Sequence, residues 1–445
     1  MQPLPVSTSS LICRVTKRHI RHLEWWSAGQ LHKRNKADVS ITLRKSPFSH
    51  RRMSTMPPPS PSPPKAPGPS DPAAFVPRKD KSPPLARPSA SIILLSPTNQ
   101  VLLLHRVQTS TAFASAHVFP GGNLSAFHDG AIPAPEDAAR HADGLPYRLG
   151  AIRETFEESG ILLARRAGGN GNGALLNLPV SERDRARKAI YENEISFGAW
   201  LESVGGVADT ENLLPFTRWV TPPGPPKRFT TQMYVYMLPV EEEEETDAER
   251  EARIPTPDGG AEITTARFDD VDAWLARQRR GEIVLFPPQC FLLHLLAPFL
   301  RGSPEAASSS SSSLSRGERM EHYRAQRARL HGFTNAVPTS THPAATNHAT
   351  SRIPWAEKVI SPVVLGLRAG DGRTILGLDK PGGELRGSER GGDWERVVLV
   401  KFGKGGPTDA EVRGREEILA EGREARAKAK AKEEEASLSL SSSKL

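Results

Sequence analysis

The sequence has no long uninterrupted apolar segment. Its longest apolar run, at about 291–300, is broken by His294 and falls well short of the roughly 18 residues that a membrane-spanning helix needs, which excludes a transmembrane protein. Cysteine is nearly absent as well, since the 445 residues contain only Cys13 and Cys290, and neither belongs to a C-x-x-C pair. The sequence therefore predicts no disulfide scaffold and no thiolate zinc site, and it favours a reducing compartment.

A concentrated basic surface is the third missing feature. The net charge is +8, but residues 1–56 hold 11 Lys and Arg side chains and only two acids, and the rest of the chain is nearly neutral. A basic tail on a neutral body is not the electrostatic pattern of a nucleic-acid-binding protein. We therefore expect no nucleic acid partner.

Composition also divides the chain into segments. Residues 1–56 are typical either of an organellar presequence or of an untranslated or disordered extension ahead of Met53 and Met56. Residues 57–88 contain 13 prolines and predict a Pro-rich linker. We expect the main domain over 89–300, a disordered Ser-rich insertion over 301–351, a C-terminal β extension of the same domain over 352–402, and a charged helix with a tail over 403–445.

Short apolar runs predict the strands and helices of the body. The runs 91–95 and 101–105 flank a turn-prone Ser-Pro-Thr-Asn and predict a β-hairpin. Further strands are expected at 218–220, 232–238, 261–268, 363–367 and 396–402. Helices are expected at 271–280, 290–300 and 411–436, and the acidic run 241–245 predicts a solvated loop.

One pair of segments contains the candidate catalytic residues. Phe-Pro-Gly-Gly, which ends in Gly121 and Gly122, is separated by 30 residues from RETFEESGILL at 153–163. On a helix, Glu154, Glu157 and Glu158 lie within about 100° of one another, and like charges at this spacing repel. A shared divalent cation such as Mg²⁺, which prefers oxygen ligands, would explain three converging carboxylates.

The neighbouring residues support this interpretation. Arg153 can reach Glu157 one turn later and orient it, and Gly160 predicts the end of the helix before a core strand at 161–163. The two glycines provide a backbone that can turn tightly beside a metal ion and a diphosphate. The alternative is that 153–159 is only the solvated face of an amphipathic helix, but the Phe-Pro-Gly-Gly upstream argues against it.

The combination resembles the Nudix box, G-x(5)-E-x(7)-R-E-U-x-E-E-x-G-U, in which U is a bulky aliphatic residue. The matching residues are Gly122, Arg153, Glu154, Glu157, Glu158, Gly160 and Ile161. Thr155 stands where the family has an aliphatic residue, and 30 residues instead of 13 lie between Gly122 and Arg153. The family's early Glu has only Asp129 and Glu136 as candidates, and neither is assigned to that position.

The long insertion makes the chain similar in particular to the peroxisomal acyl-coenzyme A diphosphatase branch of that family, also described as testosterone-regulated RP-two-like. LLLHR at 102–106, RWVTPP at 218–223, GEIVLFPPQ at 281–289 and LGLDKPGGEL at 376–385 also carry this resemblance. The branch's coenzyme A signature is only partly met, because Arg106 fits its first Arg and no second one follows before the glycines.

The resemblance implies an α/β fold, an α/β/α sandwich with a mixed β-sheet, and hydrolysis of the diphosphate bond of coenzyme A or acyl-coenzyme A. The catalytic residues that it implies are Arg153, Glu154, Glu157 and Glu158, with the three glutamates as ligands of Mg²⁺ or Mn²⁺. The implied substrate-binding residues are Arg106, Gly121, Gly122, Lys227 and Arg228. The general base is Glu154 or Glu262. Glu262 is also a candidate metal ligand, although the simpler interpretation of this residue is an ordinary exposed strand residue.

Two rival functions stay open. One is a Nudix hydrolase that acts on another nucleoside diphosphate derivative, such as NADH, ADP-ribose or a nucleotide sugar. The other is a non-catalytic module that uses the fold for binding, against which the intact set of Arg153 and three glutamates argues.

The last three residues, Ser443-Lys444-Leu445, form the tripeptide that the peroxisomal import receptor recognises. The polar SLSLSS before them would leave the tripeptide accessible to that receptor. The sequence therefore predicts a peroxisomal protein. The mitochondrion is the alternative if the basic N-terminal segment acts as a leader.

Overall fold

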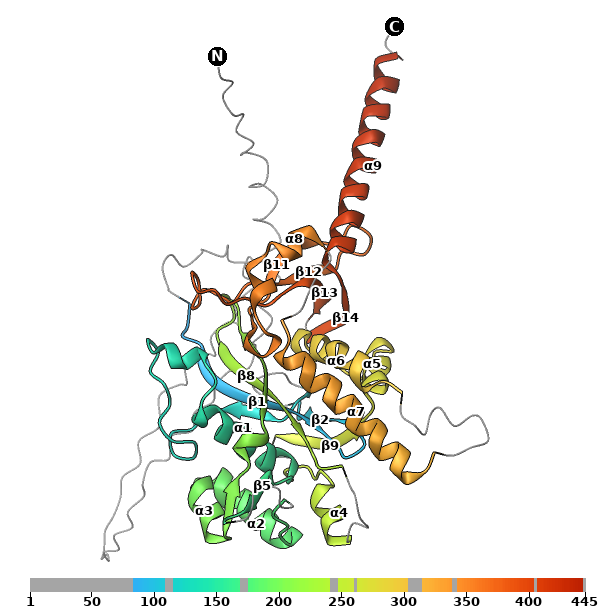
Figure 1. Ribbon diagram of the computed structural model, residues 1–445. Coiled ribbons are helices and arrows are strands. Elements are labelled where there is room, and N and C mark those ends of the chain that lie inside the picture. Colours follow the sequence, from blue (N-terminus) through green and yellow to red (C-terminus); the bar gives the residue numbers. More distant parts are fainter. Residues whose placement is uncertain are drawn as a thin grey trace, which may run out of the picture. The chain divides into compact units, whose positions relative to one another are not determined.

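The computed structural model describes residues 83–108, 115–168, 175–240, 247–259, 262–302, 314–337, 342–403 and 406–442 (Figure 1). The expectations for residues 1–56, for most of the linker, for 241–245, for the Ser-rich run and for the C-terminal tripeptide lie outside the described residues. Within the described part, no helix has the length and apolar character that a bilayer crossing requires.

A mixed β-sheet of eight strands lies at the centre of the fold. Its strands are β1 (Arg87–Leu95), β2 (Val101–Arg106), β3 (His117–Val118), β4 (Gly121–Asn123), β7 (Leu214–Val220), β8 (Phe229–Met237), β9 (Ile263–Asp269) and β10 (Val359–Ile360). The order is β10-β7-β8-β1-β2-β3, with β4 paired to β1 and β9 paired to β2. β1 runs parallel to β8 and antiparallel to β2 and β4, so the predicted hairpin is confirmed.

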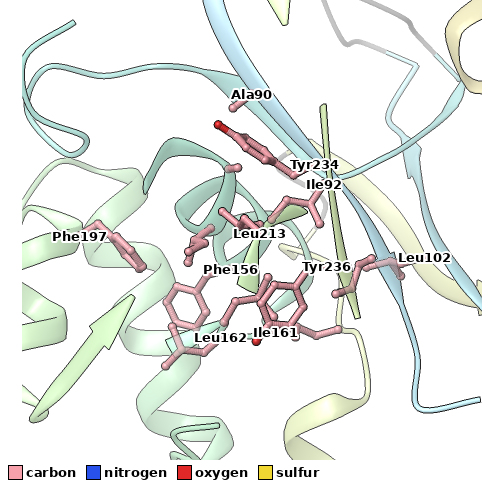
Figure 2. Packing of buried hydrophobic residues seen from close by; sticks show 14 of the residues in the cluster. Ala90, Ile92, Leu102, Phe156, Ile161, Leu162, Phe197, Leu213, Tyr234 and Tyr236 are labelled. Carbon is pink, nitrogen blue, oxygen red and sulfur yellow. The ribbon is translucent and has the colours of Figure 1, made fainter. Parts of the chain in front are cut away.

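Helices cover both faces of this sheet. On one face, Ile92 and Leu102 pack against α1 (Leu145–Ser159), α2 (Val180–Tyr191) and α3 (Phe197–Ser203), and Figure 2 shows part of this core. On the other face, Ile93 and Leu103 pack against α5 (Val271–Arg279), α6 (Pro287–Leu300) and α7 (Arg316–Asn335). Strands buried on both faces are apolar throughout rather than alternating, as SIILL and VLLLH are. The predicted α/β/α arrangement with a mixed sheet is confirmed.

The C-terminal part forms a second sheet. Its strands β11 (Val363–Leu367), β12 (Thr374–Leu378), β13 (Asp393–Gly403) and β14 (Gly406–Gly414) pair in sequence order. Leu376 and Val398 of this sheet share a core with α6, and Ile375 and Leu399 on its other face pack with Ile418 of α9 (Arg415–Ser442). The expectation of only a helix and a tail beyond 402 is wrong for β14, because the apolar residues of that strand are few and interrupted by charges.

The expectation of disorder over 301–351 is wrong for α7. A capping box between Ser315 and Glu318 begins this helix. Its apolar side chains are sparse but lie on one face, so Leu330 is fully buried and Phe333 packs against the core of α6. The charged composition of the segment conceals this spacing, because a helix needs only a narrow apolar stripe to dock.

The remaining elements are short. They are β5 (Ala164–Arg166) and β6 (Gly206–Ala208), which form a two-stranded sheet, the helices α4 (Asp247–Arg253) and α8 (Pro343–Thr346), and 3-10 turns at Ala138–His141, Thr210–Asn212, Ala349–Arg352 and Trp355–Glu357. Residues 161–163 were expected to form a core strand, but they are a buried loop that leads into β5.

Candidate active site

Helix α1 carries the three glutamates of the predicted box. Ile152 and Phe156 are fully buried in the core on this side of the sheet, where Phe156 stacks on Trp200 of α3. The helix ends at Gly160, whose φ of 72° lies in the left-handed region that glycine adopts at low cost. The helix and its stop are therefore as the sequence predicts.

The two glycines of β4 allow α1 to approach the sheet. A β-carbon at Gly122 would lie 2.4 Å from the carboxyl carbon of Glu154. A β-carbon at Gly121, whose φ is 152°, would lie 2.4 Å from the carbonyl oxygen of Ala90. The backbone N–H of Gly121 donates to Oε2 of Glu158 at 2.8 Å. Gly121 is thus required by the close contact between β4 and β1, and Gly122 leaves the space that the Glu154 carboxylate occupies.

Arg153 connects the other acidic side chains. Its Nη1 donates to Oε1 of Glu154 and to Oε1 of Glu157, both at 2.9 Å. Its Nε and Nη2 donate to the two carboxylate oxygens of Asp129, also at 2.9 Å, and Asp129 is 1% exposed. The predicted contact between Arg153 and Glu157 is confirmed, and it is one of three carboxylate contacts that this side chain makes.

Asp129 is the residue that the sequence did not assign. Glu136, the other candidate, is exposed. The box spacing places the early Glu six residues after its first Gly, and Asp129 lies seven residues after Gly122. This near match was the only sequence signal for Asp129. The insertion that follows Asp129 changes the distance to Arg153, so the spacing on that side does not help.

A second set of contacts lies beside the first. Arg106, at the end of β2, pairs through Nη1 with Oε1 of Glu158 at 3.4 Å and through Nη2 with Oε2 of Glu262 at 2.6 Å. β2 and β9 are paired with Arg106 opposite Ile263, which brings Glu262 to this position. The Glu262 side chain is 42% exposed, so this carboxylate joins the buried cluster to the surface.

The surroundings of these carboxylates disfavour the charged forms of Glu154 and Glu158. Burial raises the pKa of Glu154 to about 7, although Arg153 favours its charged form. Burial, together with the charge of Glu154, raises the pKa of Glu158 well above its ordinary value. The acidic side chains of the cluster outnumber Arg106 and Arg153, so a proton or a metal cation is needed to balance them.

This set of donors fits a hard divalent cation, but not as a complete cage. Among the described residues, no group of three or more His, Cys, Asp or Glu side chains is arranged to hold a metal ion. Mg²⁺ usually binds to one or two carboxylates and takes its remaining ligands from substrate phosphates and water. Buried carboxylate oxygens with excess negative charge on one helix turn meet that requirement.

The predicted basic residues 227 and 228 lie elsewhere. Arg228 is 3% exposed; it donates to the carbonyl oxygens of Thr221 and Pro84 and pairs with Glu384 at 2.5 Å. These contacts tie the start of β8 to the chain before β1, so the expected substrate contact of Arg228 is not supported. Lys227 is partly exposed in the loop before β8. It lies five residues before Gln232, which is aligned with Gly122 through Ala90 of the strand between them.

Comparisons with known proteins give a consistent result. No family model matches the chain. It is 29% identical over 244 residues to the acyl-coenzyme A diphosphatase NUDT19 of Gallus gallus, which covers 45% of this chain and 61% of the relative. It is 24% identical over 240 residues to the Xenopus laevis protein of the same name, with 45% and 60% covered. It is 32% identical over 153 residues to the putative nudix hydrolase 7 of Caenorhabditis elegans, with 34% and 44% covered.

The chain therefore spans about three fifths or less of the length of these relatives. Among solved structures, a NUDIX hydrolase from Alicyclobacillus acidocaldarius aligns with a TM-score of 0.36 and 23% identity, over 52% of this chain and 98% of that one. The curated relatives and the box residues gathered around Arg153 agree: over the matched part, the chain is similar to Nudix hydrolases.

Proposed function

We propose that this chain is a metal-dependent diphosphatase that hydrolyses the diphosphate bond of coenzyme A or of an acyl-coenzyme A. The observation that carries the proposal is its similarity to two relatives that bear the name acyl-coenzyme A diphosphatase. The buried carboxylate turn of α1 beside Gly121 and Gly122 supports the reaction class, because it offers oxygen ligands next to a backbone that a diphosphate can approach.

The proposed metal ligands are Glu154, Glu157 and Glu158. When bound, Mg²⁺ or Mn²⁺ neutralises charge on the diphosphate and lowers the pKa of the attacking water. Arg153 orients the carboxylates of Glu154 and Glu157, and the Gly121 N–H orients that of Glu158; because the three do not form a complete site by themselves, a bound ion would take further ligands from substrate phosphates and water.

In the proposed reaction, the water oxygen bonds to phosphorus and the bridging P–O bond breaks. The water proton passes to Glu154 or to Glu262, and the products are adenosine 3′,5′-bisphosphate and phosphopantetheine or its acyl derivative. Arg106 lies between Glu158 and Glu262 and is the basic side chain best placed to meet a substrate phosphate. Lys227 is a second candidate for contact with a substrate phosphate, and Arg228 is not proposed for that role.

A hydrolysis screen tests the proposal. Coenzyme A, acyl-coenzyme A, NADH, ADP-ribose and capped nucleotides are incubated with the protein and Mg²⁺ or Mn²⁺, and the products are identified by mass. We expect cleavage of the coenzyme A species, and we expect Glu157→Gln to lower kcat by about two orders of magnitude or more with the fold intact. Turnover of NADH or ADP-ribose alone would transfer the proposal to another Nudix substrate. An absence of all turnover would favour the non-catalytic module.

We also propose a peroxisomal location, read from Ser443-Lys444-Leu445 by the import receptor. The test is a fluorescent protein fused ahead of residues 57–445, imaged with and without the last three residues. Punctate signal that depends on the tripeptide is expected. Diffuse signal from the intact fusion, or mitochondrial signal from the full chain alone, would favour the alternative location.

A further inference from the structure

The last turn of α1 carries two of the three box glutamates, Glu157 and Glu158. Its final backbone carbonyl groups need hydrogen-bond donors from outside the helix. The final carbonyl groups of any α-helix lack intrahelical N–H donors and must be satisfied from outside. Here the N–H of Ile161, which would normally bond to the carbonyl of Glu157, is directed to the hydroxyl of Ser159. The carbonyl oxygens of Glu157, Ser159 and Gly160 therefore depend on other segments.

Helix α2 and the chain after α4 supply these donors. Arg187 donates through Nε and Nη2 to the Glu157 carbonyl oxygen, at 3.0 and 2.9 Å. The N–H of Thr256 donates to the Ser159 carbonyl oxygen at 2.8 Å. Arg183 donates through Nη1 to the Gly160 carbonyl oxygen at 3.0 Å. Two buried positive charges at a helix C-terminus also interact favourably with the helix dipole.

Arg187 further connects this turn to the segment that precedes Glu262. Its Nη1 donates to the Thr256 hydroxyl at 3.0 Å and its Nη2 to the Thr256 carbonyl oxygen at 3.2 Å. Two residues later, the carboxylate of Asp258 accepts the backbone N–H of Glu262 at 2.8 Å. A single guanidinium thus joins the main chain that bears Glu157 to the main chain that positions Glu262.

The fit around this guanidinium is close. A β-carbon at Gly160 would lie 2.7 Å from the Thr256 hydroxyl and 3.2 Å from Nη1 of Arg187. Arg187 is 7% exposed, and burying a charged group at such a site is costly unless its hydrogen bonds are made. Movement of Arg187 would therefore be transmitted to both carboxylate-bearing segments rather than absorbed by solvent.

We propose that Arg187 is a positioning residue, which holds the main chain of Glu157 and thereby the geometry of the Glu157–Glu158 turn for metal binding, and which ties that turn to the segment before Glu262; this rests on the proposed function. The Arg187 guanidinium donates to the carbonyl oxygen of Glu157 and not to its carboxylate. It acts through the backbone of Glu157 and through the 254–258 segment. Residues that orient metal ligands in this way typically change metal affinity by about 10–100-fold when they are replaced.

Arg183 provides a matched control. It lies one turn before Arg187 on α2, is comparably buried, and donates to the carbonyl oxygen of the residue that follows α1. Its acceptor belongs to Gly160, beyond the glutamates, and its other acceptors are the carbonyl oxygens of Ala252 and Glu251. Loss of Arg183 should therefore cost stability without moving the carboxylates.

The experiment compares Arg187→Met and Arg183→Met in the full chain. Mn²⁺ affinity is measured by EPR titration, thermal stability by circular dichroism, and kcat and KM on the substrate found in the screen. We expect Mn²⁺ binding at least about tenfold weaker in Arg187→Met and within about twofold of wild type in Arg183→Met, at similar losses of stability. Arg187→Lys, which keeps a donor for one carbonyl, should restore part of the affinity.

Equal Mn²⁺ affinity in the two Met variants, or wild-type affinity in Arg187→Met, would reduce Arg187 to a structural cap and overturn the proposal. If Arg187→Met does not fold, the comparison of Arg187→Lys with Arg183→Lys decides by the same criterion. A wild-type protein that hydrolyses coenzyme A or an acyl-coenzyme A keeps the proposed function whatever Arg187 does. A wild-type protein that binds no Mn²⁺ overturns both.

Discussion

Replacement of Gly122 by alanine should separate catalysis from folding. The added β-carbon would lie 2.4 Å from the carboxyl carbon and 2.5 Å from both carboxylate oxygens of Glu154, whereas ordinary contacts are about 3.4 Å or more. The carboxylate must therefore retreat by about 1 Å. Because it is the end of a flexible side chain, it can do so without displacing the backbone.

The cost can be estimated from the contacts that are lost. The retreat breaks the 2.9 Å hydrogen bond between Glu154 and Arg153, and a bond between charged groups contributes about 1.5–3 kcal/mol. Alanine recovers about 0.4–1 kcal/mol by restricting the unfolded chain, so the free energy of unfolding should fall by only about 1–2 kcal/mol. A catalytic group misplaced by about 1 Å can cost about 100-fold in rate, which is about 2.7 kcal/mol of activation free energy.

The assay compares kcat, Mn²⁺ affinity and urea denaturation of Gly122→Ala with those of Gly198→Ala. Gly198 lies in α3 with no atom within 4 Å of its added β-carbon, so this control should keep full activity and gain a little stability. The same substitution at Gly122 is then made in a Glu154→Ala background, where no carboxylate remains to be displaced. There it should change the residual rate less than about threefold.

Two results would refute this reasoning. One is a Gly122→Ala protein that keeps more than about a tenth of the wild-type rate. The other is an equally large effect of the substitution with and without the Glu154 carboxylate, which would mean that β4 itself, rather than the glutamate, is disturbed.

Three further predictions concern other residues of the fold. Asp129→Asn should destabilise the protein by about 1–3 kcal/mol and weaken Mn²⁺ binding by about 10–100-fold, because Arg153 loses its charged partner at Nε and Nη2 while it keeps Glu154 and Glu157; an unchanged urea midpoint would contradict this. Burial lowers the pKa of His117 from 6.5 to about 4, so the unfolded chain binds its proton more readily between these values and stability should fall as the pH drops from about 6.5 to 4. His117→Gln should reduce the slope of Tm against pH between about pH 4 and 6.5. An unaltered slope would contradict the lowered pKa of His117. Arg228→Met should lower the urea midpoint and leave KM within about threefold of wild type, whereas a selective rise in KM would return Arg228 to the substrate site.

Local patterns in the sequence predicted most of the elements. The apolar runs gave β1, β2, β8 and α6, because a strand or helix buried on both sides needs apolar residues throughout. The spacing of the box placed the three glutamates on one face of α1, and Gly160 marked its end, because a helix fixes which side chains are neighbours within a turn. The contact between Arg153 and Glu157 follows from that same geometry.

The sequence was less informative where the apolar signal was weak. α7 has a narrow buried stripe among charged residues, and β14 has too few apolar positions to be recognised without its partner β13. Arg228 was expected to meet substrate because basic residues near a diphosphate site often do. Only the fold showed that its guanidinium is used to join β8 to Pro84 and Glu384.

The sequence by itself determined the family resemblance, the carboxylate helix and its stop, and the two glycines, because each depends on residues that are close in the chain. The tertiary structure alone decided which distant groups surround them. Arg106 meets Glu262 across 156 positions, Arg153 meets Asp129 across 24, and Arg187 meets Thr256 across 69. Such contacts depend on strand register and on how helices pack, and no local period in a single sequence records either.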